Sequence, residues 1–428
     1  MGRAIVLHPD LGLGGAERLI VDASMALQDS GHRITIYTGY HDPNRCFRET
    51  VNGRLNVVVI GSKIPRSIFG RLHALLAYIK MIYIAFFILL FTKNDYDLVL
   101  CDQVSACIPL FKVVQLFKQQ LRIVFYCHFP DQLLTARESF LKRIYRKPID
   151  MFEEWSTNLA DKIVVNSNFT SKVVKRTFSS LYNRNLIVLY PCVDVNQLAR
   201  SKPSLTDCNP FVRECVEKVI DAEDSYVFLS LNRFERKKDI RLAIEALQKL
   251  QSELDNVSEK RNKMRCAKQV FLFVAGGYDE RLTECVDYYS ELADLVSSNK
   301  YLEEQVMFIR SPDENEKLML LRTCDAVIYT PENEHFGIVP IEAMAMSKPV
   351  IASSSGGPLE TIVDSSPSAT GKLCEHTKDS FANAMLSLSQ NRELSRKLGS
   401  NGLKRVQSHF SYEIFSKQIN RICFDSAR

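Results

Sequence analysis

The chain has 428 residues, of which 46% are hydrophobic and 25% are charged, and this composition predicts a folded protein with two domains or one large one. Its formal net charge of +5 is mild, and its basic segments are broken by acidic or apolar residues, which argues against a nucleic-acid-binding protein. The 12 cysteines are scattered without a CxxC pair, so reduced thiols facing the cytosol are expected rather than a zinc site or a disulfide framework. The first apolar run, Ala4 to His8, is too short for a signal peptide and predicts a strand.

Short apolar runs alternate with longer helical patterns in both halves of the chain. The predicted strands are 4–8, 33–38, 55–61, 98–102, 122–128, 162–167 and 186–191 in the first half, and 226–232, 269–277, 306–310, 326–331 and 349–353 in the second. Continuous Val/Ile/Leu runs separated by helices indicate parallel sheets that are covered on both faces.

Two such sheets predict an α/β protein with two Rossmann-like domains. We expect these domains at residues 1–200 and 212–405, separated by a Pro-, Ser- and Asn-rich segment at 192–211. A last helix within 406–428 is expected to pack back on the first domain. Ligands of doubly wound sheets bind beyond the carboxyl ends of the strands, so two facing sheets would form a cleft with one substrate on each side.

An apolar segment at residues 72–91 has about the length of a membrane span, roughly 20 residues. Lys80 lies in its middle, where a charge in the bilayer is costly, and the uninterrupted run 81–91 is too short to span. The segment is therefore either a membrane-associating helix, spanning or embedded, or a helix of the protein core.

A glycine-rich turn follows the first predicted strand. In LHPDLGLGGAERL the helix opens near Ala16, so the amides of Gly14 and Gly15 would point outward at its N-terminus. Such amides attract phosphate, and glycine lets a ligand approach the backbone closely. The spacing is not the GxGxxG of dinucleotide sites, so a plain strand–helix turn is the alternative interpretation.

Basic residues follow two strands of the second half. Arg233 and Lys238 stand where strand 226–232 gives way to an amphipathic helix. An arginine fork and a lysine point charge at this edge could bracket a diphosphate, whereas a solvated charge run is the alternative. Arg310 ends strand 306–310, and such strand-end loops commonly frame a nucleotide base.

The segment NEHFGIVPIEAMAMS predicts a turn and a short helix after strand 326–331. Pro340 suits the first turn of a helix, where a missing N–H costs nothing. The amides of Gly337, Ile338 and Val339 would then lie at the N-terminus of this helix.

Two carboxylates flank that turn. Glu342 is expected in the first helical turn, where it could cap the helix or accept hydrogen bonds from a ribose. Glu334 precedes the turn and has no capping role, so it could bind sugar hydroxyls or stabilise positive charge at an anomeric carbon. A second amide-rich turn is expected near Gly356 and Gly357.

These motifs together resemble a known family. EHFGIVPIE resembles the E-x7-E motif of the family 4 glycosyltransferases, which are retaining enzymes of the GT-B fold with two Rossmann-like domains facing across a cleft. LGGAERL is similar to the glycine loop of that family, NRFERKK to its diphosphate-binding pair and SGGPLE to a second phosphate turn. Longer strings such as CDQVSACIP, FYCHFPD and AGGYDER resemble the mannosyltransferases of asparagine-linked glycosylation. The resemblance covers nearly the whole chain.

The resemblance assigns roles in the second domain residue by residue. Glu334 matches the first motif glutamate, near the donor sugar, and Glu342 matches the second, on the ribose. Arg233 and Lys238 match the diphosphate pair. One departure is visible at Asp239, where the family often has glycine, and this departure leaves the backbone path there open.

In the first domain, the resemblance assigns Gly15 to the loop near the phosphate and His128 to a strand end facing the transferred sugar; a packed or surface histidine is the alternative for His128. The expected catalytic residues are Glu334, His128, Arg233 and Lys238. The expected donor-binding residues are Gly15, Arg233, Lys238, Arg310, Glu334, Gly337, Ile338, Val339 and Glu342.

The resemblance also implies substrates and a location. The donor would be GDP-mannose, and the acceptor an oligosaccharide on dolichol pyrophosphate that receives an α1,3-linked and then an α1,6-linked mannose with retention. The implied location is the endoplasmic reticulum membrane, with the catalytic domains on its cytosolic face. Membrane contact and contacts with other mannosyltransferases of the same pathway are expected, but no nucleic acid, no metal and no required cofactor.

Three alternatives stay open at this point. Asp95 and Asp97 resemble the DxD metal site of another glycosyltransferase fold, but they precede a strand instead of following one and predict a turn. A catalytically inactive scaffold would bind nucleotide sugars without transfer. A different donor, UDP-glucose or UDP-N-acetylglucosamine, would fit the short motifs equally well.

Overall fold

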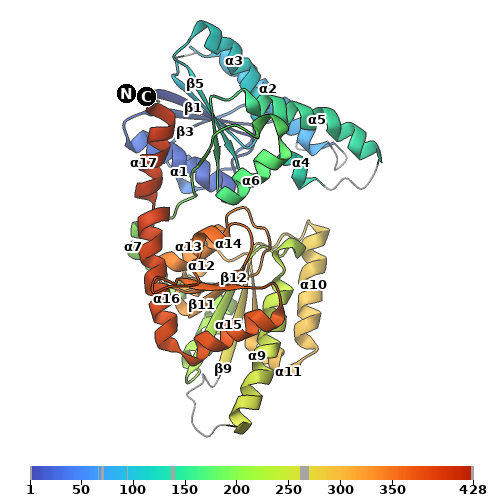
Figure 1. Ribbon diagram of the computed structural model, residues 1–428, viewed down its shortest axis with the longest axis vertical. Coiled ribbons are helices and arrows are strands. Elements are labelled where there is room, and N and C mark those ends of the chain that lie inside the picture. Colours follow the sequence, from blue (N-terminus) through green and yellow to red (C-terminus); the bar gives the residue numbers. More distant parts are fainter. Residues whose placement is uncertain are drawn as a thin grey trace. The chain divides into compact units, whose positions relative to one another are not determined.

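The computed structural model describes residues 2–65, 67–68, 72–93, 95–135, 140–260 and 269–425, and residues 255–260 are described by backbone alone. The chain divides into two compact units (Figure 1). The N-terminal unit comprises Met1–Cys192 and Tyr412–Arg428, and the C-terminal unit comprises Val193–Ser411. The first unit thus ends upstream of the predicted limit at residue 200, and the chain returns to it at its C-terminal end.

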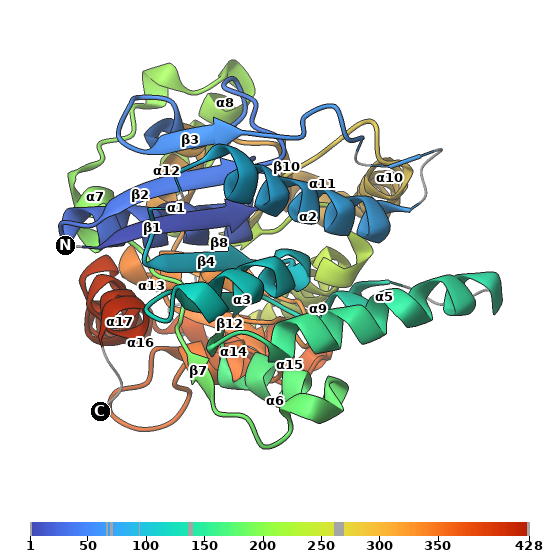
Figure 2. The same ribbon diagram turned by 90° about the horizontal axis from the view of Figure 1, so that it is seen from above.

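A parallel sheet organises the N-terminal unit. Within the described residues it has seven strands in the order β3-β2-β1-β4-β5-β6-β7, and the first four follow one another in Figure 2. The strands are β1 (Arg3–His8), β2 (Arg33–Thr38), β3 (Asn56–Val59), β4 (Leu98–Asp102), β5 (Arg122–Cys127), β6 (Lys162–Val165) and β7 (Leu186–Val188).

Helices cover both faces of this sheet, because alternate side chains of its strands point to opposite sides. Ala4 and Val6 of β1 pack toward α1 and α17, whereas Ile5 and Leu7 pack toward α2, α3 and α5. The helical segments are α1 (Gly15–Asp29), η1 (Arg48–Thr50), α2 (His73–Phe91), η2 (Ser105–Cys107), α3 (Ile108–Phe117), α4 (Asp131–Leu134), α5 (Phe140–Asn158), α6 (Asn168–Thr177), η3 (Ser179–Leu181) and α17 (Tyr412–Phe424).

The C-terminal helix α17 belongs to the N-terminal unit and lies against α1 (Figure 1). Its buried Phe415 and Ile419 join the same apolar cluster as Leu19 of α1. Asn420 Nδ2 donates a hydrogen bond of 3.3 Å to Ala26 O. Helix α17 is therefore a structural part of the first domain.

The apolar segment predicted at 72–91 forms α2, which packs on the domain with one face. Over its most apolar 18 residues the mean hydropathy is 2.4 and 39% of the residues are buried, and its other face exposes large apolar side chains. Lys80 does not face that side, because it is buried and its Nζ lies 3.0 Å from Asp10 Oδ1 in the loop after β1. The charge that argued against membrane contact is thus satisfied inside the domain.

A second parallel sheet organises the C-terminal unit. Within the described residues it has six strands in the order β10-β9-β8-β11-β12-β13. The edge strand β13 was not predicted, because Gly371 and Lys372 interrupt its apolar run. The strands are β8 (Ser225–Leu231), β9 (Gln269–Gly276), β10 (Val306–Arg310), β11 (Ala326–Tyr329), β12 (Val350–Ser353) and β13 (Gly371–Cys374).

Helices surround this sheet as well, and α9, α10 and α15 share one apolar cluster with it. The helical segments are α7 (Val195–Arg200), η4 (Leu205–Asp207), α8 (Pro210–Asp221), η5 (Arg236–Lys238), α9 (Ile240–Lys260), α10 (Thr283–Ser297), α11 (Lys300–Gln305), α12 (Glu314–Thr323), α13 (Ile338–Ala345), α14 (Pro358–Thr361), α15 (Lys378–Gln390), α16 (Arg392–Arg405) and the π-helical turn η6 (Val406–Phe410).

Both sheets share one topology, in which the first strand lies between the second and the fourth. The chain order therefore reverses between β1 and β4 in one unit and between β8 and β11 in the other. Loops diverge at such a switch point, and ligands bind there beyond the carboxyl ends of the strands. The predicted fold class, with two Rossmann-like α/β domains, is confirmed, and the topology indicates one candidate site in each unit.

Candidate functional site

The switch point of the N-terminal sheet holds three connected polar side chains. His8 ends β1 and Asp102 ends the neighbouring β4, while His128 follows β5. The Asp102 carboxylate lies 2.7 Å from His8 Nδ1 and 2.9 Å from His128 Nε2. His8 and Asp102 are fully buried, whereas His128 is partly exposed. Asp102 therefore links the carboxyl ends of β1 and β5.

Contacts within this group keep its buried members charged. Burial lowers the pKa of His8, but the hydrogen bond to Asp102 and the charges of Asp102 and Glu17 outweigh it and raise the pKa to about 9. Burial raises the pKa of Asp102, yet the charges and hydrogen bonds of His128 and His8 bring it below its ordinary value. Removing one member would leave an uncompensated buried charge, which is strongly destabilising.

Asp102 also sets the orientation of His128. A carboxylate only accepts hydrogen bonds, so His128 Nε2 carries the hydrogen that it donates to Asp102. Nδ1 is then the ring nitrogen that is not committed to Asp102. Asn166 Nδ2 donates a 3.2 Å hydrogen bond to the backbone oxygen of His128 and holds the loop from the β6 side. The catalytic role of His128 stays a prediction.

The glycine loop ends at the N-terminus of α1. Gly15 is the first residue of this 15-residue helix and is exposed, and a Cβ added there would meet nothing within 4 Å. Its surroundings leave room for a ligand at the helix N-terminus, where backbone amides favour anions. Glu17 occupies the first turn, and its Oε1 lies 4.0 Å from His8 Nε2.

The switch point of the C-terminal sheet brings together the two residues expected at the donor diphosphate and sugar. Lys238 follows β8 and Glu334 follows β11, and Lys238 Nζ forms a short ion pair with Glu334 Oε2. Both side chains are mostly buried, with 13% and 19% exposed. Burial raises the pKa of Glu334, but the Lys238 charge and hydrogen bond outweigh it and hold the pKa below its ordinary value.

Glu334 therefore has structural partners that the sequence did not reveal. Besides Lys238, the buried Tyr329 senses its charge: burial, followed by the Glu334 charge, puts the pKa of Tyr329 well above its usual range. The resemblance assigns Lys238 to the diphosphate of the donor and Glu334 to its sugar. In the structure these two side chains contact each other.

The SGGP turn acts on Glu334 through the backbone. Gly357 N donates to Glu334 O at 2.7 Å. Gly356 has a φ of +61°, and a Cβ added there would lie 2.5 Å from the same oxygen, so the close approach requires glycine. The Gly357 amide is consequently committed to the motif segment, and phosphate binding by this turn stays a prediction.

Gly337 begins α13 in a conformation that favours glycine. It is the N-cap residue with a φ of 86°, and a Cβ added there would approach the ring of Tyr329 to 3.1 Å. Ile338 and Val339 are the first two helical residues, so their amides have no carbonyl partner within the helix and can bind an anion.

The predicted position of Glu342 in the first turn is wrong. Because α13 already begins at Ile338, Glu342 is its fifth residue and lies beyond the first turn. Its Oε1 lies 2.6 Å from Lys317 Nζ of α12. Capping of α13 is thus excluded as its role, and the ribose assignment stays a prediction.

The other basic candidates differ in how firmly they are held. Arg233 has 62% of its side chain exposed, and its Nη1 lies 2.7 Å from Glu235 Oε1. The guanidinium of Arg310 lies 5.0 Å from the ring centroid of Tyr278 and 5.5 Å from that of Tyr289. These cation–π contacts hold Arg310 against an aromatic cluster at the carboxyl end of β10.

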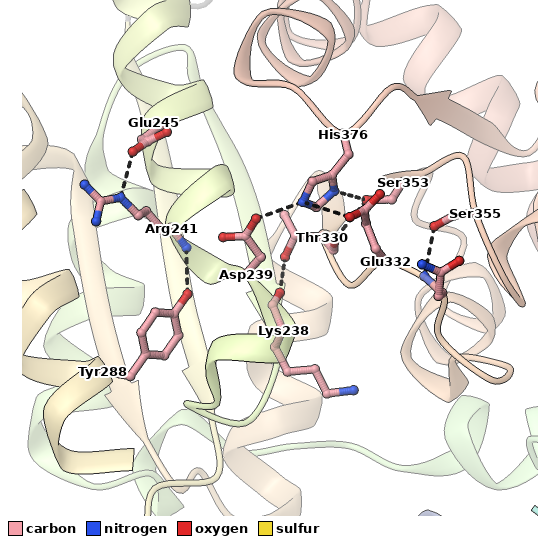
Figure 3. Close-up of polar contacts among 11 residues, drawn as sticks. Lys238, Asp239, Arg241, Glu245, Tyr288, Thr330, Glu332, Ser353, Ser355 and His376 are labelled. Atoms are coloured by element: carbon pink, nitrogen blue, oxygen red, sulfur yellow. Dashed lines mark hydrogen bonds and ion pairs between the residues drawn. The ribbon is translucent and has the colours of Figure 1, made fainter. Parts of the chain in front are cut away.

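The structure shows which backbone path the chain takes at Asp239, where the family often has glycine. Asp239 adopts the left-handed conformation that glycine favours, with φ 41° and ψ 52°. Its Oδ2 lies 2.8 Å from His376 Nε2, and the two side chains face each other in Figure 3. Aspartate thus takes the backbone path of a glycine, with a side-chain contact in addition.

Sequence reasoning missed several residues of these sites. Asp102 carries a recognisable signal, since it ends the apolar strand LVLCD at the expected edge of the sheet. Tyr329, Lys317 and His376 carry no such signal, because their partners lie far away in the sequence.

The DxD-like pair lies at the opposite end of its sheet. Asp97 precedes β4 and accepts a 3.0 Å hydrogen bond from Arg3 N, while Asp95 pairs with the Arg3 side chain. These acids are therefore part of the turn that opens a strand. In the parts of the chain that the structure describes, no group of three His, Cys, Asp or Glu side chains could hold a metal ion.

Comparison with known proteins identifies the class to which this arrangement belongs. Residues 13–197 match glycosyltransferase family 4, and residues 213–405 match glycosyl transferases group 1. Among solved structures, sucrose-phosphate synthase from Thermosynechococcus elongatus has a TM-score of 0.71 at 20% identity and covers 99% of this chain and 98% of its own. WaaG, a glycosyltransferase involved in lipopolysaccharide biosynthesis, has a TM-score of 0.67 at 16% identity, with coverages of 99% and 100%. These structures confirm the predicted GT-B fold.

Sequence relatives narrow the class further. The alpha-1,3/1,6-mannosyltransferase ALG2 of Dictyostelium discoideum is 45% identical over 419 residues, which cover 97% of this chain and 96% of that protein. The protein of the same name from Homo sapiens is 44% identical over 419 residues, with coverages of 97% and 94%. The chain therefore belongs to the family of alpha-1,3/1,6-mannosyltransferases within the family 4 glycosyltransferases, and it is a glycosyltransferase enzyme.

The raised pKa of His8 predicts a pH-dependent stability of the N-terminal unit. Because the pKa rises from 6.5 to about 9 on folding, the stabilisation is fully present below pH 6.5 and is lost as the pH rises through 9. The free energy of unfolding should fall across this window by on the order of 3 kcal/mol. His8→Gln should flatten this part of the curve, measured by chemical denaturation at each pH. The exposed His409→Gln is the control, and equal slopes for wild type and His8→Gln would contradict the assignment.

Proposed function

We propose that this mannosyltransferase uses GDP-mannose as donor and a dolichol-pyrophosphate-linked oligosaccharide as acceptor. It adds an α1,3-linked and then an α1,6-linked mannose with retention of configuration, at the cytosolic face of the endoplasmic reticulum membrane. No metal and no further cofactor takes part. The proposal rests on the family and, within the structure, on the Lys238–Glu334 pair at the C-terminal switch point.

The composition of that site suits a sugar diphosphate. Lys238, Arg233 and the amides of Ile338 and Val339 supply positive charge and hydrogen-bond donors, and the mostly buried Glu334 supplies a negative group that pairs with Lys238. When a diphosphate arrives, Lys238 exchanges one anionic partner for another. Glu334 is then free to accept hydrogen bonds from the sugar.

These residues suit a front-face transfer. The bond between the anomeric carbon and the β-phosphate oxygen breaks, and the acceptor oxygen bonds to the same face of that carbon. The acceptor proton passes to the departing phosphate, so GDP leaves with it. Lys238 and Arg233 stabilise the charge that grows on the leaving group, and Glu334 stabilises the positive charge at the sugar. His128 is expected to orient the sugar from the N-terminal unit.

A lipid-linked acceptor agrees with the apolar surface of the N-terminal unit. The outward face of α2 exposes large apolar side chains: Ile79, Tyr83, Phe86, Leu90 and Phe91. Helix α5 of the same unit also exposes apolar side chains, Phe140, Leu141 and Ile144, together with Lys142 and Arg143. Apolar side chains beside basic ones are typical of helices that lie in the membrane interface. This surface supports shallow membrane contact and leaves Lys80 paired inside the domain.

Loss of the diphosphate-binding charges should abolish transfer without unfolding the protein. With GDP-mannose and a phytanyl-pyrophosphate acceptor, product masses of the wild type should show one and then two added mannoses. Arg233→Ala and Lys238→Ala should each lower the rate by about 10²-fold or more, the scale found for charge-stabilising groups. Lys237→Ala, which removes the exposed neighbouring charge, is the matched control. Near-normal transfer by Lys238→Ala would overturn the assignment.

Polar substitutions on the outward face of α2 should weaken membrane binding. Phe86→Ser with Leu90→Ser should reduce sedimentation with phosphatidylcholine–phosphatidylserine vesicles by about tenfold or more, because burial of a large apolar side chain contributes roughly 1.5–3 kcal/mol. GDP affinity should not change. The control is Phe211→Ser with Ile220→Ser on α8 of the C-terminal unit, where both side chains are also exposed. Equal losses in the two double variants would contradict a specific membrane face.

A further inference from the structure

A closed ring of hydrogen bonds surrounds the backbone of Lys238 (Figure 3). Thr330 Oγ1 donates to Lys238 O at 2.6 Å, and Ser353 Oγ donates to Thr330 O at 2.7 Å. His376 Nδ1 lies 3.0 Å from Ser353 Oγ, and His376 Nε2 lies 2.8 Å from Asp239 Oδ2. Because Asp239 directly follows Lys238, the ring closes on the residue from which it started.

The ring joins four strand ends of the C-terminal sheet. Thr330 follows β11, Ser353 ends β12 and His376 follows β13, while Lys238 and Asp239 follow β8. Thr330 and Ser353 are fully buried, so their hydroxyl groups have no water to replace a lost partner. His376 and Asp239 are partly exposed and stand at the outer side of the ring. His376 thus connects the carboxyl edge of the sheet to the loop that carries Lys238.

The donors in this ring can be assigned from its acceptors. A carbonyl oxygen only accepts, so the hydroxyl hydrogen of Ser353 goes to Thr330 O, and Ser353 Oγ accepts from His376 Nδ1. The carboxylate of Asp239 also only accepts, so it receives the hydrogen of His376 Nε2. Both ring nitrogens of His376 therefore have a hydrogen-bond partner in the ring. Besides Asp239, the imidazole faces Glu332, whose Oε2 is 3.9 Å from Nε2.

Asp239 needs such a contact because of its backbone. A side chain at φ 41° meets the steric penalty of the left-handed region, which glycine avoids. The His376 contact holds the aspartate in this conformation, which ends the turn η5 and directs the Lys238 side chain toward Glu334. A glycine here would need no contact.

We infer that His376 is a positioning residue for donor binding: it holds Asp239 in the left-handed turn and thereby holds Lys238 at the diphosphate. This inference rests on the proposed function, in which Lys238 binds the diphosphate of the donor. His376 acts through Asp239 and touches neither the sugar nor the reacting atoms.

A double-mutant cycle tests the inference. His376→Ala should raise the Kd for GDP, measured by calorimetry, by about tenfold, the factor expected when one charge-assisted hydrogen bond is lost. The KM for GDP-mannose should rise in parallel, and the KM for the lipid acceptor should stay constant. In an Asp239→Gly background the same substitution should change the Kd by less than about twofold, because glycine keeps the turn unaided.

Two further variants sharpen the cycle. Asp239→Ala keeps a Cβ but removes the carboxylate, so it should weaken GDP binding as His376→Ala does. His409→Ala removes an exposed histidine of the same unit and serves as the control. An unchanged GDP affinity in His376→Ala would overturn the inference. So would a tenfold loss that persists in the Asp239→Gly background, since His376 would then act on the ligand directly.

Failure of the inference differs from failure of the proposed function. If Lys238→Ala loses GDP affinity while His376→Ala keeps it, the diphosphate assignment stands and the positioning role falls. If Lys238→Ala itself binds GDP as tightly as the wild type, the proposed function falls, whatever His376 does. Thermal unfolding of each variant shows whether a lost affinity reflects a lost fold.

Discussion

The ion pair between Lys238 and Glu334 is the interaction on which the rest of the C-terminal site depends. Two mostly buried opposite charges stand where the strand order reverses, and each compensates the desolvation of the other. The surrounding structure fixes both partners: Gly356 and Gly357 hold the Glu334 backbone, and the ring through His376 holds that of Lys238. In the proposed function a diphosphate takes the place of Glu334 at Lys238, and Glu334 then accepts hydrogen bonds from the sugar.

The N-terminal unit also buries charged groups at the switch point of its sheet, where they must compensate one another. There the buried acid is Asp102, and the compensating groups are His8 and His128. His8 is fully enclosed and serves the charge balance, while His128 is partly exposed and is held in one orientation. This chain, a member of the family of alpha-1,3/1,6-mannosyltransferases, thus has two Rossmann-like sheets, and the switch point of each sheet holds a buried ion pair.

The sequence predicts those features that depend on local pattern. Continuous apolar runs indicate buried parallel strands, and strand-end residues such as Lys238 and Glu334 fall where the topology makes them neighbours. Prediction from the sequence fails where a side chain contacts a residue that is distant in the chain. The pattern puts the helix start at Pro340, two residues after the observed start at Ile338, and so predicts Glu342 in the first turn; β13 is not predicted because it is short and interrupted by Lys372. The role of His376 could not be predicted, because its contacts form only when the fold brings three strand ends together.

Binding of GDP to Glu334→Gln tests the central claim most directly. If the Lys238–Glu334 pair is exchanged for a diphosphate, removing the carboxylate charge frees Lys238, so calorimetry should give a Kd equal to or lower than that of the wild type. Mannose transfer by the same variant should fall by about 10²-fold or more, because the charge at the sugar is lost. A Kd for GDP that rises as much as in Lys238→Ala would contradict the account, since Glu334 would then support Lys238 and not compete for it.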